Sequence, residues 1–178
     1  MGAIERILPY YTYEDFKHWE GHWEIIDGIP YAMAPMPIVK HQAIGGNLYA
    51  LFWNELKDCQ NCKVYQPIDY FIKDDTVLEP DMLVVCGDII NKKYLDFPPH
   101  LVCEILSPST ALKDRHTKYN IYQSQKIPYY IIISPITEEV EIYVLRSGVY
   151  ELKQKGKDVK EEFQFEDCTV SVDFNRIW

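Results

Sequence analysis

The segment 100–134 constrains the fold more than any other, because two apolar runs flank one amphipathic stretch. "HLVCEILS" (100–107) and "YYIIIS" (129–134) are near-continuous hydrophobic runs of strand length, a pattern typical of strands buried on both faces. Between them, in "SPSTALKDRHTKYNIYQSQK", apolar and aromatic residues recur at helical spacing. A helical crossover is right-handed and makes the two strands it joins parallel. The chain is therefore predicted to contain a βαβ unit in an α/β sheet.

The rest of the chain supplies further elements around this unit. They are a short helix at "TYEDFKHW" (12–19), a hairpin turning at Asp27-Gly28, a helix over 38–57, strands over 63–72 and 81–86, a connection over 87–99, and an antiparallel continuation from "EVEIYVL", "VYELKQ" and a strand near 168–172. The core order is thus αβββαβ in a mixed α/β sheet of six or more strands. The length of 178 residues suits one domain, spanning 1–178.

The charge of the chain is acidic overall and basic in one place. The net charge is −9, which counts against nucleic-acid binding by bulk electrostatics alone. Residues 111–126 nevertheless hold four bases and one acid, and the simplest explanation is a solvated helix face. No apolar run approaches the roughly 20 residues of a membrane span, so no membrane partner is expected.

The cysteines favour a reducing compartment. Their number is odd, at five, and their spacing is irregular, which fits reduced thiols in the cytoplasm better than a disulfide framework. Cys59 and Cys62 have the C-x-x-C spacing, but no second pair of cysteines or histidines completes a zinc site. Ordinary thiols are therefore expected.

Two carboxylates interrupt the predicted core strands. Asp81 opens one strand in "LEPDMLVVC", and Glu104 lies in the middle of the next. A buried carboxylate is costly unless it is paired or binds a metal. Asp81 alone suits a turn, and Glu104 alone suits a salt bridge to Lys118 or Arg115. Together, on adjacent strands, they favour a shared divalent cation such as Mg²⁺ or Mn²⁺.

The same residues belong to a longer pattern. It comprises Glu79-Pro80-Asp81, Glu104-Ile105-Leu106-Ser107-Pro108-Ser109-Thr110, Asp114-Arg115-His116-Thr117-Lys118, Tyr122, Glu24-Ile25-Ile26-Asp27-Gly28 and His41. The pattern resembles the Uma-type restriction endonuclease family, a branch of the PD-(D/E)xK nuclease superfamily. The resemblance covers roughly residues 10–175.

The resemblance implies a restriction-endonuclease-like fold and magnesium-dependent cleavage of DNA phosphodiester bonds. Asp81 and Glu104 would be metal ligands, and the backbone carbonyl of Ile105 would add a third protein oxygen. The superfamily lysine normally stands two residues after the glutamate, where this chain has Leu106. Lys118 in the helix is the candidate replacement and would orient water or stabilise charge in the transition state.

Three residues form a second tier of candidates, each with an ordinary alternative. Asp114 lies four residues before Lys118 on the same helix face, and the alternative is a surface ion pair. His41 opens the helix over 38–57 and would contact phosphate or water, or else cap the helix. Glu24 would be a third carboxylate, or a polar residue that alternates along a half-exposed strand.

The leading expectation is a cytoplasmic, magnesium-dependent endonuclease that hydrolyses DNA with activated water. The alternative is a catalytically inactive nuclease fold that serves as a binding or assembly module, which the acidic charge and Leu106 both favour. A phosphodiesterase for small nucleotides is a third option. A homodimer is plausible because two symmetric sites suit the two strands of a duplex.

Overall fold

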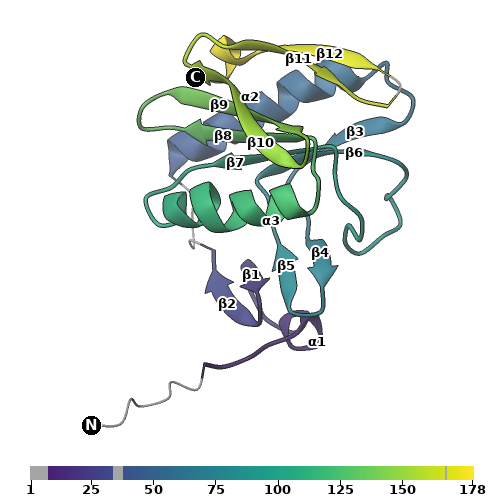
Figure 1. The fold of residues 1–178 in the computed structure, drawn as a ribbon, viewed down its shortest axis with the longest axis vertical. Coiled ribbons are helices and arrows are strands. Elements are labelled where there is room, and N and C mark those ends of the chain that lie inside the picture. Colours follow the sequence, from purple (N-terminus) through teal and green to yellow (C-terminus); the bar gives the residue numbers. More distant parts are fainter. Residues whose placement is uncertain (1–7, 34–37, 167) are drawn as a thin grey trace.

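The main sheet has six strands, flanked by helices (Figure 1). A computed structural model describes residues 8–33, 38–166 and 168–178. The strands are β3 (Cys62–Tyr65), β6 (Met82–Cys86), β7 (Leu101–Ile105), β8 (Tyr129–Ser134), β9 (Glu139–Arg146) and β10 (Val149–Gly156). They lie in the order β10-β9-β8-β7-β6-β3, and β7 pairs with β8 in parallel. The predicted βαβ unit and mixed sheet are confirmed.

Both faces of this sheet are covered at its centre, because β6 and β7 are buried at every position and their side chains point alternately to the two faces. The helix α2 (Val39–Leu56) packs Ile44 and Leu48 into the same cluster as Cys103 and Ile105 of β7. The other face of β7, at Val102, packs in the cluster of Tyr122. Tyr122 belongs to α3 (Tyr119–Ser124), which continues directly from a π-helical segment, η1 (Lys113–Lys118). The two predicted helices are therefore confirmed, the second with a π-wound beginning.

A second sheet lies below the first in Figure 1 and is made from the N-terminal hairpin and two short strands. Its order is β2-β1-β5-β4, with β1 (Trp23–Ile26), β2 (Ile29–Ala32), β4 (Tyr70–Lys73) and β5 (Thr76–Leu78), and α1 (Tyr13–Phe16) lies beside it. The predicted turn at Asp27-Gly28 is confirmed, since both residues have positive φ angles, of 48° and 78°. The capping box of Thr12 and Asp15 begins α1.

Two strand predictions need correction. The single strand expected over 63–72 is wrong, because β3 ends at Tyr65 and β4 begins at Tyr70 in a different sheet. Pro67 stands in between and has no N–H to donate to a strand ladder. The last strand is confirmed as β12 (Thr169–Asp173), but it pairs with β11 (Lys160–Gln164) in a sheet of their own. The 3₁₀ helix η2 (Phe174–Ile177) follows and packs near α2.

The expectation of reduced thiols is also wrong for four of the five cysteines. Disulfides join Cys59 to Cys168 and Cys62 to Cys86, while Cys103 is free and buried. The partners are 109 and 24 residues apart, so local spacing could not reveal them. Cys62 and Cys86 face each other in the antiparallel register of β3 and β6. In the described part of the chain, no helix is long and apolar enough to cross a membrane.

Candidate active site

The carboxylates of Asp81 and Glu104 lie at the same end of the neighbouring strands β6 and β7. The β6–β7 register pairs Met82 with Cys103, so one further step places Asp81 beside Glu104. Oδ2 of Asp81 accepts a hydrogen bond of 2.7 Å from the backbone N–H of Ile105. The Asp81 side chain is 20% exposed and that of Glu104 only 3%. One carboxylate therefore faces solvent at the strand mouth, and the other lies deeper.

Lys118 reaches Glu104 from the helical crossover that joins β7 to β8, at the end of η1. Its side chain is fully buried, and its Nζ lies 2.5 Å from Oε1 of Glu104 and 2.7 Å from Oε1 of Glu24. The hydroxyl of Tyr122, one helical turn later, donates a 2.6 Å hydrogen bond to the same Oε1 of Glu104. The helix thus contributes one cation and one hydroxyl to a single carboxylate oxygen.

Glu24 ties the smaller sheet to this cluster. It is completely buried, and its carboxylate forms ion pairs with both Lys113 and Lys118. Its Oε1 also accepts a 3.0 Å hydrogen bond from the backbone N–H of Glu79. Glu24 is therefore not a residue of a half-exposed strand. It lies between two lysines and one backbone donor.

Opposing forces set the pKa values inside the cluster. Burial raises the pKa of Glu104 well above its usual value, and Lys118 only partly offsets this. Burial also raises the pKa of Glu24, but Lys118 and Lys113 outweigh it and the pKa is lowered. Burial alone lowers the pKa of Lys118, but Glu104 and Glu24 reverse the effect and hold the pKa well above its usual range. The cluster therefore favours the charged forms of Lys118 and Glu24 and disfavours the ionised form of Glu104.

His41 lies beside Asp81 at the beginning of α2. It is the third residue of α2, and its Nε2 is 2.9 Å from the carbonyl oxygen of Ile105 and 3.6 Å from Oδ2 of Asp81. Burial alone would lower the pKa of His41, but Asp81 and the Ile105 carbonyl outweigh it and raise the pKa. His41 is thus next to the first candidate metal ligand and is more than a helix cap.

Asp114 belongs to the interior of the cluster. It is 2% exposed, and its carboxylate lies 3.8 Å from Nζ of Lys118. Its backbone carbonyl accepts a 2.9 Å hydrogen bond from the hydroxyl of Tyr130. Burial raises the pKa of Asp114. The alternative of a surface Asp114–Lys118 pair is therefore wrong, because both side chains are buried.

The oxygen atoms of Asp81, Glu104 and the Ile105 carbonyl are of the kind that binds a hard divalent cation, although the side chains alone do not provide a complete coordination shell. Tyr122 and Lys118 both contact Oε1 of Glu104, and the hydrogen bond to Asp81 falls on Oδ2, so each carboxylate has a second oxygen to offer. Carboxylate and carbonyl oxygens are the ligands that Mg²⁺ and Mn²⁺ prefer. Among the described residues, no three His, Cys, Asp or Glu side chains form a metal-binding group. Any ion here would need further oxygens, from Ile105, water or phosphate.

Three groups at the site were not assigned a role there from the sequence. They are the ammonium of Lys113, the hydroxyl of Tyr122 and the backbone N–H of Glu79. The i, i+4 spacing from Lys118 could have revealed Tyr122, but Lys113 meets Glu24 only through the arrangement of the two sheets. Arg115, a suggested partner for Glu104, instead pairs with Glu141 at 2.9 Å.

Comparisons with known proteins identify the family of this chain. Residues 11–172 match the Uma2 family, described as "Putative restriction endonuclease". An uncharacterized protein of Synechocystis sp., slr1290, is 31% identical over 145 residues, covering 76% of this chain and 75% of the relative. The crystal structure of a putative nuclease of the DUF820 family from Anabaena variabilis superposes with a TM-score of 0.67 at 20% identity, covering 79% of this chain and 83% of that chain. The chain therefore belongs to the Uma2 family of putative restriction endonucleases.

Proposed function

We propose that this protein is a magnesium- or manganese-dependent endonuclease that hydrolyses phosphodiester bonds of DNA on a restriction-endonuclease-like fold. The observation that carries the proposal is the convergence of Asp81, Glu104 and Lys118 at one edge of β6 and β7. Membership of the Uma2 family supports it. Two carboxylates and a cation are the groups that metal-dependent attack of water on a phosphodiester requires.

Each residue has a distinct part in this proposal. Asp81, Glu104 and the carbonyl of Ile105 would hold the cation, which when bound supplies Lewis acidity to a phosphate oxygen and acidifies water. Lys118 keeps Glu104 oriented by its 2.5 Å contact and places positive charge beside the reaction centre. His41 places its imidazole ring 3.6 Å from Asp81, where it would contact phosphate or water. Water attacks phosphorus in line with the leaving oxygen.

A plasmid-cleavage assay with one isosteric variant tests the proposal. Asp81→Asn keeps an oxygen that can accept from the N–H of Ile105 but removes the negative charge that a divalent cation needs. We expect wild-type protein to nick supercoiled DNA with Mg²⁺ or Mn²⁺ and not in EDTA, and Asp81→Asn to be inactive with unchanged melting temperature. Asp96→Asn is the matched control, because Asp96 is a solvent-exposed partner of Lys92. Cleavage by Asp81→Asn at the wild-type rate would refute the assignment.

A second candidate function is a non-cleaving DNA-binding or assembly module with the same fold. The observation that favours it is the Glu104–Lys118 ion pair, which also satisfies Glu104 as a purely structural group. Calorimetric titration with Mn²⁺ separates the two proposals. Heat of binding that disappears in Asp81→Asn supports the nuclease, and no binding at millimolar Mn²⁺ supports the module.

A further inference from the structure

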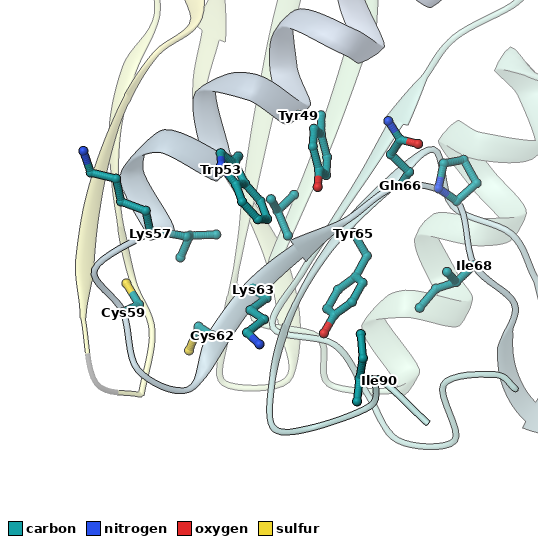
Figure 2. Close-up of a pocket in the computed structure, with 13 residues that line it drawn as sticks. Tyr49, Trp53, Lys57, Cys59, Cys62, Lys63, Tyr65, Gln66, Ile68 and Ile90 are labelled. Atoms are coloured by element: carbon teal, nitrogen blue, oxygen red, sulfur yellow. The ribbon is translucent and has the colours of Figure 1, made fainter. Parts of the chain in front are cut away.

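A groove between the second half of α2 and β3 lies outside the candidate active site. Its volume is about 580 Å³, within the range of pockets that hold organic ligands. We define the aromatic groove by the residues used below: Tyr49, Trp53, Lys57, Lys63 and Tyr65. Figure 2 shows the three rings near one another, with Lys63 beside Tyr65 and Lys57 extending outward from the end of α2.

The rings of this groove are arranged for stacking. Tyr49 and Trp53 are one helical turn apart on α2, with centroids 6.1 Å apart and planes inclined by 24°. The Trp53 side chain is 55% exposed, which is unusual for a residue whose burial contributes strongly to stability. Tyr65 projects from the facing strand into the same hollow (Figure 2). The groove thus has aromatic rings on its helix side and on its strand side.

The charge of the aromatic groove is opposite to that of the whole protein. The chain carries 27 acidic and 18 basic side chains, yet the groove is lined by Lys57 and Lys63 and by no Asp or Glu. In the part of the chain that the structure describes, neither lysine forms a salt bridge with a carboxylate. Aromatic rings flanked by cations suit a strand of unpaired nucleotides, whose bases stack and whose phosphates are anionic.

The aromatic groove also lies near the candidate active site along two elements. Tyr65 pairs with Leu83 across β3 and β6, two residues after Asp81. On α2, His41 precedes Tyr49 by about two helical turns. Tyr65 and Tyr49 therefore lie within a few residues of the candidate active site along β6 and α2.

We infer that the aromatic groove binds an unpaired nucleic-acid strand next to the scissile phosphate, an inference that rests on the proposed nuclease function. A second copy of this chain is the competing occupant, because β3 is the last strand of the main sheet. Lys63 argues against that occupant, since an exposed lysine on an edge strand opposes pairing with another sheet. The charge and the rings together favour a nucleotide strand.

Binding of a fluorescein-labelled 20-nucleotide single strand, measured by anisotropy in EDTA, tests the inference without cleavage. We expect Trp53→Ala to bind at least fivefold more weakly, as the loss of one base stack predicts, and Trp53→Phe to recover most of the affinity. Lys63→Gln should reduce the slope of log affinity against log salt by about 0.7. Lys126→Gln is the control, because that lysine lies at the end of α3 on the other face of the sheet.

The outcomes separate the groove from the catalytic proposal. Trp53→Ala that binds the strand as tightly as wild type overturns the inference, as does a concentration-dependent dimer that Trp53→Ala dissociates. If Trp53→Ala loses strand binding but Asp81→Asn keeps it, the groove is supported whether or not wild-type protein cleaves plasmid DNA. Absence of plasmid cleavage by the wild-type protein with Mg²⁺ or Mn²⁺, with strand binding still dependent on Trp53, contradicts the proposed activity alone.

Discussion

Replacing Lys118 by methionine should destabilise the protein strongly, because it removes the central cation of a buried cluster. Lys118 is fully buried and lies 2.5 Å and 2.7 Å from two carboxylates that are also buried. Breaking a buried ion pair from one side typically costs about 3–5 kcal/mol. For a chain of this size, that corresponds to a drop of roughly 6–20 °C in melting temperature.

The loss of folding stability in Lys118→Met should come mainly from the unpaired Glu104 and should depend on pH. Among the residues that the structure describes, Glu24 keeps Lys113 as a partner, whereas Glu104 keeps the Tyr122 hydroxyl alone. Without Lys118, the pKa of Glu104 in the folded protein is raised further above its unfolded value. The stability of the variant is therefore highest at low pH and falls as pH rises through the folded pKa. The double variant Lys118→Met/Glu104→Gln should recover part of the loss, because the two changes act on one interaction.

Differential scanning calorimetry at pH 5 and pH 8 measures these effects. Lys92→Met is the matched control, since Lys92 lies 2.5 Å from Asp96 and the two side chains are 41% and 45% exposed, and exposed pairs contribute about 0–1 kcal/mol. A loss in Lys118→Met no larger than in Lys92→Met would refute the conclusion that this cluster depends on its central cation.

Three further predictions follow from other contacts. Tyr122→Phe removes a buried 2.6 Å hydrogen bond to Glu104 and should cost about 1.5–3 kcal/mol in urea unfolding. Tyr129→Phe should cost much less, because the Tyr129 hydroxyl makes only exposed contacts of 3.2 and 3.4 Å with the backbone of Gln164. Burial and the nearby Glu79 raise the pKa of Asp69 to about 6, so the free energy of unfolding should fall as pH rises from about 4 to about 6. Urea midpoints measured across this pH range should lose this part of their pH dependence in Asp69→Asn. Alkylation of the denatured, unreduced protein should label Cys103 alone, and labelling of all five cysteines by mass spectrometry would contradict the two disulfides.

Sequence patterns predicted the parts of this fold that depend on local periodicity. The apolar runs of β7 and β8 and the helix between them indicated a parallel pair, which the register of Leu101 with Tyr129 confirms. The strand expected over 63–72 failed for a different reason. Its alternation continues through Pro67, but the partners of β3 and β4 lie in two separate sheets, and no local signal specifies which sheet a strand joins.

The candidate site was predictable only where its residues share one supersecondary unit. Asp81 and Glu104 were placed on adjacent strands, and the crossover brings Lys118 back over the second strand. Glu24, Lys113 and the N–H of Glu79 meet because the small sheet packs against the large one. That contact joins pairs of residues that are separated by 89 and by 55 positions in the sequence. At such separations, a single sequence does not indicate which residues pair.

The position of Lys118 offers a physical reason why this chain can have leucine at 106. Leu106 packs among apolar residues of the face covered by α3, and its N–H bonds to the carbonyl of Ile133 at 2.8 Å. A lysine at position 106 would place its charge among these apolar side chains. Lys118 instead reaches Glu104 from the helix that covers the same face. The helix also contributes Tyr122 to the same oxygen. Two donors from one helical segment therefore hold the Glu104 carboxylate, and removing either would leave a buried charge less well satisfied.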